Sequence, residues 1–407
     1  MKNNNTECVA MLLAGGEGRR LSPLTGQMAK PVVPFGDQYR MIDFPLNNCV
    51  NSNINKIGVL TQYCADSIHS YINEDQPSLL KSSTTCDITM LPSSNKCKDG
   101  YAGTADAIYQ NMDYIDRHAP EHVLILSGDH IYQMDYRPML KFHQESGASA
   151  TIAVKKVAWR EASRFGILNT DDQYRVSSFV EKPAKPQSNL ASMGIYLFRW
   201  KELKKYLIAD AANPSSTHDF GKDIIPAILS SKANMAAYPY EGYWRDVGTI
   251  DSLWEANMDL LDGEFKLKVS EGSKDAVKRT ALNHYESPYT DIVESILHSA
   301  SSVEAQVVRS IVCSGVTVGR NSEILESVIM PGARIGRNVT IHRAIIGEGA
   351  VIGDGAYIGR LDDEICVVGP GEVVAASSKS MNDYNLEPLS SILSIASDHE
   401  HSNSNIG

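Results

Sequence analysis

The segment 12–21 carries the first residues whose types and spacing could do chemistry. It reads Leu-Leu-Ala-Gly-Gly-Glu-Gly-Arg-Arg-Leu, so glycines follow an apolar run and two arginines follow the glycines. Glycines at the end of a strand let backbone N–H groups approach phosphate oxygens, because no Cβ stands in the way. The pattern favours a polyphosphate-binding loop, although a tight surface turn with two incidental arginines would look the same.

Three better-known phosphate loops do not fit this segment. A P-loop requires Gly-x-x-x-x-Gly-Lys-Ser/Thr, which the segment lacks. The dinucleotide fingerprint and the kinase glycine loop both require Gly-x-Gly-x-x-Gly, but Leu21 stands where the third glycine belongs. The polyphosphate must therefore be held in some other way.

Two acidic residues stand where ligands bind in α/β proteins. Asp129 follows an apolar run in Ile-Leu-Ser-Gly-Asp-His, and Asp246 lies in Tyr-Trp-Arg-Asp-Val-Gly-Thr, just before an expected helix. Either one alone could be a helix cap or a loop residue, but two at one edge of a sheet form the oxygen-rich site that Mg²⁺ prefers. We therefore expect Asp129 and Asp246 to hold Mg²⁺, with Lys30 nearby as a cation. His130 is expected to orient or pack rather than to act as an acid or base.

Five short apolar segments predict the strands that must position these residues. Thr104 and Thr249 can each cap a helix between or after them. Alternating strands and helices predict an α/β domain with a Rossmann-like, mostly parallel sheet, covered on both faces and expected over residues 1–262. Ligands bind such sheets at the carboxyl ends of the strands. The segments are 9–13, 56–61, 122–126, 150–154 and 192–198.

The periodicity of the apolar residues changes after about residue 300. The apolar residues Ala333, Val339, Ile345, Val351 and Tyr357 recur every six residues, with Ile-Gly pairs between them. A six-residue repeat of this kind predicts a parallel β-helix, which usually serves assembly or regulation. We place the β-helix at 301–375, a connector at 263–300 and a polar tail at 376–407, whose end from Ser397 to Gly407 is expected to be disordered.

Composition narrows the class of protein. The net charge of −11 argues against nucleic acid as the main partner, because binding a phosphate backbone usually requires a basic face. The seven cysteines are odd in number and contain no Cys-x-x-Cys pair, so neither a disulfide framework nor a zinc site is indicated. The sequence holds no run of eighteen apolar residues and no signal-peptide core, so we expect a cytoplasmic protein without a membrane span.

At these residues the sequence resembles the sugar-nucleotide pyrophosphorylases, and within them the bacterial glucose-1-phosphate adenylyltransferases. The shared segments run in family order over about 8–262, and the six-residue repeat stands where the family has a left-handed parallel β-helix. The segments include Tyr-Arg-Met-Ile-Asp-Phe-Pro-Leu-Asn-Asn-Cys at 39–49, Gly-Thr-Ala-Asp-Ala at 103–107, Ser-Gly-Asp-His-Ile-Tyr at 127–132, Glu-Lys-Pro at 181–183, His-Asp-Phe-Gly-Lys-Asp at 218–223 and Tyr-Trp-Arg-Asp-Val-Gly-Thr at 243–249.

The resemblance implies a role for each matching position. Catalysis would fall to Arg20, Asp129, Lys182 and Asp246, with the two aspartates on the metal. The nucleotide would be bound by Leu13, Ala14, Gly15, Gly16, Lys30, Gln62, Gly103 and Thr104. Glucose 1-phosphate would be surrounded by Tyr101, Gly166, Glu181, Lys182, Ser192, Tyr196, Asp219 and Trp244. Glu181 and Asp219 suit sugar hydroxyls, Trp244 suits an aromatic wall, and Lys182 suits a phosphate.

The implied reaction makes ADP-glucose and pyrophosphate from ATP and glucose 1-phosphate, supplying glycogen biosynthesis in an Mg²⁺-dependent, allosteric homotetramer. Two other readings stay open. A sister enzyme using UTP or dTTP would share the loop and both aspartates, and a non-catalytic regulatory subunit would share the fold. Such subunits usually lose a metal carboxylate or the sugar-site lysine, and this sequence keeps both.

The sequence departs from the family where many members bind a phosphorylated activator. The usual Lys-Arg pair before Ala-Lys-Pro is replaced by Gln27 and Met28, and the usual histidine before Phe-Gly by Pro34. Arg40 is kept, and Ala102 stands where an arginine is common. The loss of positive charge predicts weak or altered control by fructose 1,6-bisphosphate.

Overall fold

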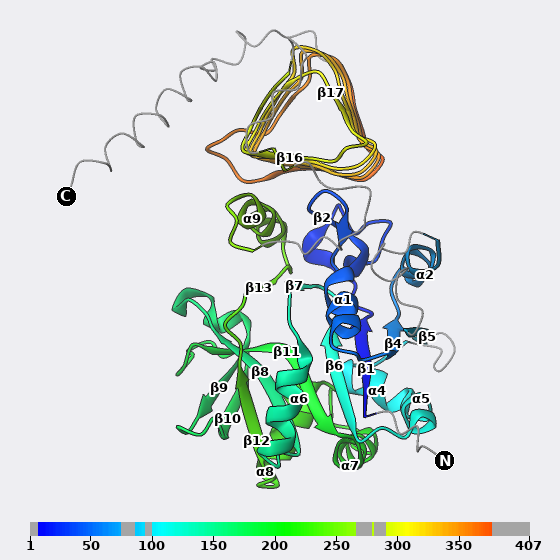
Figure 1. Cartoon of the computed structure of the whole chain (residues 1–407), viewed down its shortest axis with the longest axis vertical. Coiled ribbons are helices and arrows are strands. Elements are labelled where there is room, and N and C mark those ends of the chain that lie inside the picture. Colours follow the sequence, from blue (N-terminus) through cyan, green and yellow to red (C-terminus); the bar gives the residue numbers. More distant parts are fainter. Residues whose placement is uncertain (1–6, 75–85, 94–99, 266–278, 281–289, 377–407) are drawn as a thin grey trace, which may run out of the picture.

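The computed structural model describes residues 7–74, 86–93, 100–265, 279–280 and 290–376. A sheet-and-helix domain lies at one end of the long axis and a triangular β-helix at the other (Figure 1). The predicted site residues all belong to the first of these domains.

Nine strands form the main sheet of the first domain. They are β1 (Cys8–Ala14), β4 (Lys56–Thr61), β5 (Asp87–Pro92), β6 (His122–Ser127), β8 (Ala150–Lys156), β9 (Gly166–Thr170), β10 (Val176–Glu181), β11 (Leu190–Arg199) and β12 (Met235–Pro239). Their order is β10-β9-β11-β6-β1-β4-β5, with β8 beside β11 and β12 beside β8. β5, β4, β1 and β6 run parallel, whereas β11 runs antiparallel to β6. The Rossmann-like α/β fold is confirmed, and β1 lies near its centre.

Helices cover both faces of this sheet, because successive side chains of a buried strand point to opposite faces. Ala10 and Leu12 pack into the core beneath α1, α2 and α6, whereas Val9 and Met11 pack beneath α4, α5 and α7. The helices are α1 (Asp43–Asn51), α2 (Ala65–Glu74), α4 (Thr104–Gln110), α5 (Met112–His118), α6 (Tyr136–Glu145), α7 (Trp200–Ala211), α8 (Ile225–Ser230) and α9 (Ile250–Leu261).

Short elements fill the loops between these helices and strands. A second, two-stranded sheet pairs β7 (His130–Tyr132) antiparallel with β13 (Trp244–Asp246). The others are β2 (Pro34–Phe35), β3 (Tyr39–Arg40), η1 (Arg19–Leu21), η2 (Lys30–Val32), η4 (Trp159–Arg164) and η5 (Phe220–Ile224).

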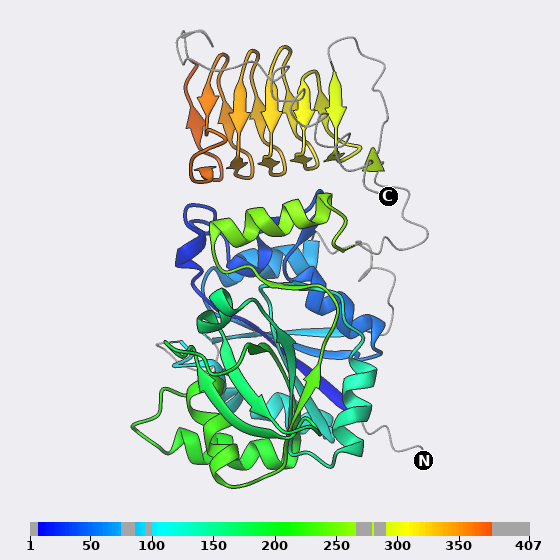
Figure 2. The ribbon, with the colours of Figure 1, turned by 90° about the vertical axis from the view of Figure 1, so that its left-hand side faces the viewer.

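Three sheets build the left-handed β-helix, whose coils stack side by side in Figure 2, and their strands run parallel except for the edge strand β14, which is antiparallel to β16. One sheet holds β15 (Asp291–Val293), β18 (Gln306–Val308), β21 (Glu323–Leu325), β24 (Thr340–His342) and β27 (Tyr357–Ile358). The second holds β14 (Arg279–Thr280), β16 (Ser295–Leu297), β19 (Ile311–Val312), β22 (Val328–Ile329), β25 (Ala344–Ile346) and β28 (Cys366–Val368). The third holds β17 (Ser302–Val303), β20 (Thr317–Val318), β23 (Arg334–Ile335), β26 (Val351–Ile352) and β29 (Val373–Val374).

The β-helix begins earlier than the sequence predicted. Its first coil starts at Asp291, inside the expected connector 263–300, because 291–312 contains no glycine and so lacks the Ile-Gly rhythm of the later coils. Serine side chains help to hold these early coils: the N–H groups of Ser310 and Ser327 donate to the hydroxyls of Ser295 and Ser310. Apart from its first residue, the tail expected at 376–407 lies outside the described residues.

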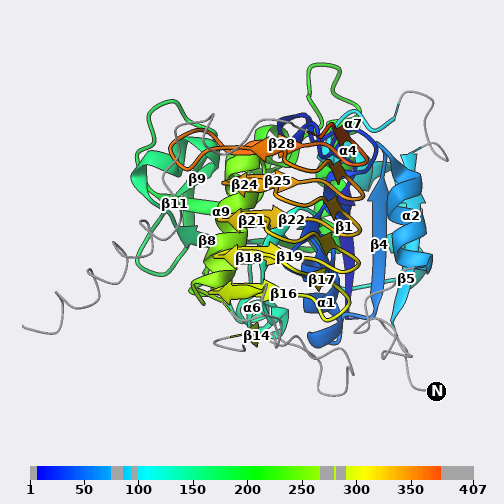
Figure 3. The ribbon, with the colours of Figure 1, turned by 90° about the horizontal axis from the view of Figure 1, so that it is seen from above.

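Helix α9 packs between the sheet-and-helix domain and the β-helix. Thr249 and Ser252 form a capping box at its start, as the sequence led us to expect for Thr249. Leu253 and Ala256 share one hydrophobic core with Ile311 and Ile345 of the β-helix, and Figure 3 shows α9 running beneath the coils. Within the described part of the chain, no helix has both the length and the apolar character needed to cross a bilayer.

Candidate active site

A cavity of about 410 Å³ opens at the carboxyl end of β1. All eight residues predicted to bind the nucleotide lie in its wall, although their part in binding stays a prediction. The lining residues are Leu13, Ala14, Gly15, Gly16, Lys30, Pro31, Leu60, Gln62, Tyr63, Tyr101, Gly103, Thr104, Ala107, Ser127 and Asp129. The glycine loop, two strand ends and the start of α4 therefore enclose one space at the carboxyl edge of the sheet, where ligands bind in open α/β folds.

Close packing explains why Gly103 has no side chain. A Cβ on Gly103 would stand 2.3 Å from the carbonyl oxygen of His218, well inside van der Waals contact. That carbonyl also accepts the N–H of Ala105 at 2.8 Å, which fixes the start of α4 against the loop before η5. Gly103 thus lets the wall of this cavity pack closely against the segment that carries Asp219.

Gln62 and Tyr101 are held together at the wall of the cavity. The Tyr101 N–H donates to Oε1 of Gln62 at 2.9 Å. The Tyr101 hydroxyl donates to the Leu91 carbonyl at 3.0 Å and accepts from Asn111 Nδ2 at 2.9 Å. Tyr101 was expected around glucose 1-phosphate, and the structure places it in the wall of the same cavity as Gln62.

Asp129 is anchored by two neighbours at the end of β6. Lys30 forms an ion pair with Oδ2, and the Ser127 hydroxyl donates to Oδ1. Burial by itself raises the pKa of this carboxyl, but the attraction of the Lys30 ammonium outweighs it, so the pKa lies well below its ordinary value. Asp129 therefore carries a full negative charge at neutral pH.

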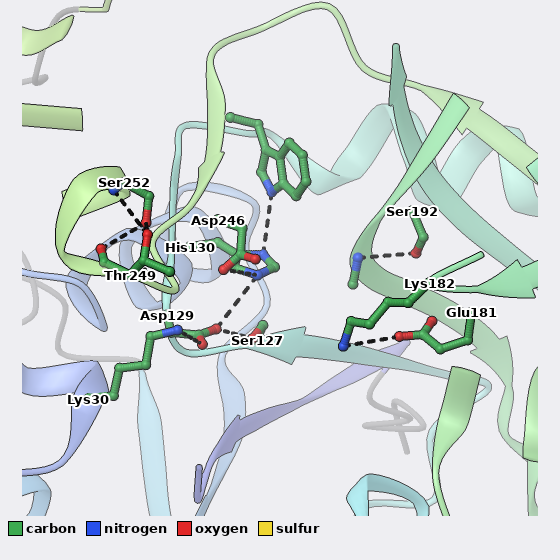
Figure 4. Close-up of polar contacts among 12 residues, drawn as sticks. Lys30, Ser127, Asp129, His130, Glu181, Lys182, Ser192, Asp246, Thr249 and Ser252 are labelled. Atoms are coloured by element: carbon green, nitrogen blue, oxygen red, sulfur yellow. Dashed lines mark hydrogen bonds and ion pairs between the residues drawn. The ribbon is translucent and has the colours of Figure 1, made fainter. Parts of the chain in front are cut away.

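The second aspartate converges on the first through the short sheet. Asp246 is the direct ladder partner of His130 in the β7–β13 pair. Nε2 of His130 lies 3.6 Å from Oδ1 of Asp129 and 3.7 Å from Oδ1 of Asp246. The two carboxylate oxygens thus flank one nitrogen atom, as Figure 4 shows. The sequence predicted that these carboxylates meet, and the structure brings them together.

His130 was expected to orient or pack, but its contact with both carboxylates was not predicted. It lies between the two carboxylates, and its ring packs edge-on against Trp244, with the ring centroids 5.5 Å apart. The available signal was its place directly after Asp129 in the six-residue motif 127–132, but one histidine beside a carboxylate does not reveal a second carboxylate on its other side.

Trp244 was expected to form an aromatic wall beside the sugar, and the structure shows that its side chain is buried. Its side chain is only 7% exposed and packs against Phe165, with ring centroids 5.3 Å apart. The indole N–H donates to Nδ1 of His130 at 3.3 Å. The ring therefore supports His130 and leaves little surface for a ligand, because the register of β13 with β7 turns it inward.

Arg20 lies beside the second aspartate. A Cβ on Gly248 would stand 3.0 Å from Nη2 of Arg20 and 3.4 Å from Oδ1 of Asp246. The guanidinium thus lies against Gly248, next to Asp246, while Arg20 itself is exposed. Arg20 and Asp246 therefore lie close together in space, although most of the domain separates them in the sequence.

Six of the eight residues predicted for the sugar, all except Tyr101 and Trp244, form a second group around Glu181. Its Oε2 lies against two glycines: a Cβ on Gly166 would stand 2.8 Å from it, and a Cβ on Gly221 would stand 2.6 Å from it. Burial raises the pKa of Tyr196, and the nearby carboxylates of Glu181 and Asp219 raise it further, so its hydroxyl remains a proton donor. The Ser192 hydroxyl lies 3.5 Å from that hydroxyl.

Asp219 links this second group to the wall of the glycine-loop cavity. Its Oδ1 accepts the N–H of Gly221 at 2.9 Å, and its Oδ2 accepts the Thr104 hydroxyl at 2.9 Å. Asp219 therefore caps η5 and ties it to α4, so its carboxylate already has protein partners where we expected an acceptor for sugar hydroxyls.

Lys182 occupies the edge of the second group. Its backbone is left-handed, with φ of 46°, and its N–H donates to the Phe165 carbonyl at 3.1 Å. Nζ lies 3.4 Å from Oε1 of Glu181, and the side chain is 65% exposed. Figure 4 shows Lys182 and Glu181 on one side of the site and Lys30 and Asp129 on the other. Its ammonium can thus serve as a mobile positive charge.

The donor set fits Mg²⁺ carried in with a nucleotide. Among the described residues, no group of three or more His, Cys, Asp or Glu side chains is arranged to hold a metal. Two converging carboxylates beside a phosphate-sized cavity are what Mg²⁺ uses when phosphates and waters complete its six ligands. Two carboxylates without phosphates should bind a divalent cation only weakly, because a tightly held permanent metal would need more protein ligands.

Comparisons with known proteins agree with both halves of the chain. The family described as nucleotidyl transferase matches residues 9–263, and the family described as GlmU-like C-terminal hexapeptide matches residues 281–365. The glucose-1-phosphate adenylyltransferase of Geobacillus stearothermophilus is 49% identical over 327 residues, which cover 78% of this chain and 83% of that protein.

Two further relatives carry the same name. The glucose-1-phosphate adenylyltransferase of Clostridium botulinum strain Alaska E43 is 51% identical over 324 residues, covering 79% of this chain and 84% of its own length. That of Halalkalibacterium halodurans is 51% identical over 322 residues, covering 78% and 84%. The likeness therefore extends over both domains.

Proposed function

The chain belongs to the glucose-1-phosphate adenylyltransferase family of nucleotidyl transferases, and we propose that it makes ADP-glucose and pyrophosphate from ATP and glucose 1-phosphate. The observation that carries the proposal is the convergence of Asp129 and Asp246 on one point beside the glycine-loop cavity. The relatives' shared name supports the choice of ATP and glucose 1-phosphate as substrates.

The proposed reaction needs no general base. The phosphate of glucose 1-phosphate attacks the α-phosphorus of ATP, and pyrophosphate leaves. Because the second pKa of a phosphate monoester is about 6, the attacking oxygen is already mostly ionised at neutral pH. What the protein must supply is alignment of two anions that repel each other, together with neutralisation of their charge.

The positive side chains are distributed to meet that need. We assign Arg20 to the departing pyrophosphate, because it follows the glycine loop and lies beside Asp246. Lys30 lies in the cavity wall and offsets the charge of Asp129. Lys182, the exposed lysine beside Glu181, is assigned to the phosphate of glucose 1-phosphate. A lysine suits this last role, since its flexible stem lets a point charge follow the phosphate.

We further propose that Mg²⁺ is the metal and that Asp129 and Asp246 hold it. When bound, Mg²⁺ would stabilise negative charge on the phosphates of the two substrates. The two aspartates would keep their place through Lys30, Ser127 and His130, which contact them in its absence.

One assay tests the reaction and the nucleotide together. Pyrophosphate release from glucose 1-phosphate is measured with ATP, UTP, dTTP and GTP, each with and without Mg²⁺. We expect the highest kcat/KM with ATP and no turnover without the metal. Faster release with UTP or dTTP would identify a sister enzyme, and release with none of the four would support a regulatory subunit.

Other aspects of the function are proposed on family membership alone. We propose that the product supplies glycogen synthesis, that the enzyme works in the cytoplasm, and that four copies assemble. Its β-helix is the part suited to assembly, because stacked coils expose flat strand faces to a neighbour. Size-exclusion chromatography with light scattering tests the tetramer, and a monomeric mass would contradict it.

A further inference from the structure

The contact between Trp244 and His130 determines which imidazole nitrogen carries hydrogen. An indole N–H can only donate, so Nδ1 of His130, 3.3 Å from Trp244 Nε1, must accept. In a neutral imidazole the other nitrogen then carries the hydrogen. Nε2–H of His130 is therefore the group that faces the two aspartates.

This N–H lies between two like charges. Nε2 is 3.6 Å from Oδ1 of Asp129 and 3.7 Å from Oδ1 of Asp246, so one N–H faces carboxylates on two separate segments. Two carboxylates this close repel each other unless something positive or hydrogen-bonding stands between them. In the protein without bound ligands, the imidazole of His130 is the group that stands between the two carboxylates.

The ring has little freedom to leave this position. Its side chain is 12% exposed, and Trp244 packs edge-on against it. On another side lies Gly194, in a bulge of β11 where the pairing with β8 shifts register, and a Cβ there would stand 3.3 Å from Cε1 of His130. Gly194 has φ of 67°, a conformation that glycine adopts without strain. The bulge and the indole thus hold the imidazole from two directions.

We propose that His130 is a positioning residue that holds Asp129 and Asp246 around one divalent-cation position before substrates arrive, and that Trp244 fixes the tautomer that does so. The inference rests on the proposed function, because it takes the two carboxylates as metal ligands. It assigns His130 no proton transfer and no contact with the reacting atoms.

The test measures cation affinity separately from turnover. Mn²⁺ alone is titrated into the purified full-length protein, and free Mn²⁺ is followed by electron paramagnetic resonance. The variants are His130→Ala, His130→Gln, which keeps an amide N–H near the place of Nε2, and Trp244→Phe. Trp200→Phe is a matched control, because Trp200 is equally buried and its indole N–H donates to Asp116 at 2.8 Å, away from the site.

We expect His130→Ala to raise the Mn²⁺ dissociation constant by about 10- to 100-fold, the usual range for groups that orient metal ligands. His130→Gln should recover most of that loss, Trp244→Phe should show a smaller loss, and Trp200→Phe should match wild type. In turnover assays, His130→Ala should require more Mg²⁺ yet approach the wild-type kcat at saturation.

Wild-type Mn²⁺ affinity in His130→Ala, or equal losses in Trp244→Phe and Trp200→Phe, would overturn the proposal. So would the absence of Mn²⁺ binding by the wild-type protein at millimolar concentration. These outcomes differ from a failure of the proposed function. If wild type releases pyrophosphate but His130→Ala binds Mn²⁺ normally, only the inference fails. If the variants lose Mn²⁺ as expected but wild type releases no pyrophosphate, only the function fails.

Discussion

Arg40 and Glu348 join the catalytic domain to the β-helix through a two-pronged ion pair. Nη1 and Nη2 of Arg40 each donate to a different oxygen of Glu348 at 3.1 Å, and Nη1 also donates to the Val32 carbonyl at 2.6 Å. The pair is only partly exposed, so solvent screens it less than a surface pair. Residues more than three hundred positions apart thus fix how the two domains meet.

Removing one partner of this pair should destabilise the protein. Glu348→Gln leaves the Arg40 guanidinium without its carboxylate, at a cost of about 1–3 kcal/mol in the free energy of unfolding. The control is Glu304→Gln, whose partner Arg320 lies 2.9 Å away on the exposed surface of the β-helix, and it should leave stability unchanged. Urea unfolding of both variants checks this, and equal stability of Glu348→Gln and wild type would count against the interdomain role.

Lys182 should govern the affinity for glucose 1-phosphate. Since a hydrogen bond to a charged group contributes about 1.5–3 kcal/mol, Lys182→Gln should raise the KM for glucose 1-phosphate about 10-fold or more and leave the KM for ATP near its original value. Lys185→Gln is the matched control, because Lys185 is exposed and also precedes a proline. Steady-state kinetics with each substrate varied in turn decide the matter. If both variants behave alike, Lys182 does not contact the sugar phosphate.

The stability of the protein should depend on pH through His143. This side chain is fully buried, and burial together with His122 and Arg199 lowers the pKa of His143 to about 3. Below the ordinary pKa of 6.5 the unfolded chain binds a proton that the folded chain excludes, so stability falls as the pH falls from 6.5 toward 3. The slope approaches about 1.4 kcal/mol per pH unit.

A comparison of wild type with His143→Gln isolates this effect. Burial raises the pKa of Asp43 to about 7, which gives the opposite slope in the same pH range, but Asp43 contributes equally to both proteins. The difference in free energy of unfolding between them, measured in urea at pH 7.5, 6.5 and 5.5, should shift in favour of the variant as the pH falls. A difference that does not change with pH would show that His143 titrates normally.

Activation by fructose 1,6-bisphosphate should be weak. Gln27 and Met28 lack the charge that many family members have there, and the Arg40 guanidinium is already paired with Glu348. Initial rates with and without the effector at micromolar concentration test this expectation. A large activation would show that other cations of the chain bind the anion.

The sequence could predict where each aspartate stands, but not how the two meet. Asp129 follows an apolar run that must be a buried strand, so its place at a strand end could be inferred. Its meeting with Asp246 depends on the β7–β13 ladder, whose strands have three residues each and give no periodic signal. For the same reason, the position of His130 between the carboxylates could not be seen.

The contacts of Trp244 and Asp219 could not be predicted from the local sequence. The family resemblance implied that Trp244 lies at the sugar, and the structure shows its side chain buried against Phe165. Asp219 was expected to accept from the sugar, yet its carboxylate caps η5 and accepts from Thr104, a residue far away in the sequence. Such contacts depend on tertiary packing, which a motif does not encode.

The most direct test of the account compares Asp246→Asn with Asp172→Asn, a control at an exposed turn residue. Asp246 is preferred to Asp129, because removing the Asp129 charge would leave the buried Lys30 unpaired. At saturating ATP, glucose 1-phosphate and Mg²⁺, we predict that kcat for pyrophosphate release falls about 100-fold or more in Asp246→Asn while its circular dichroism stays that of wild type. A wild-type kcat in that folded variant would contradict the two-carboxylate metal site.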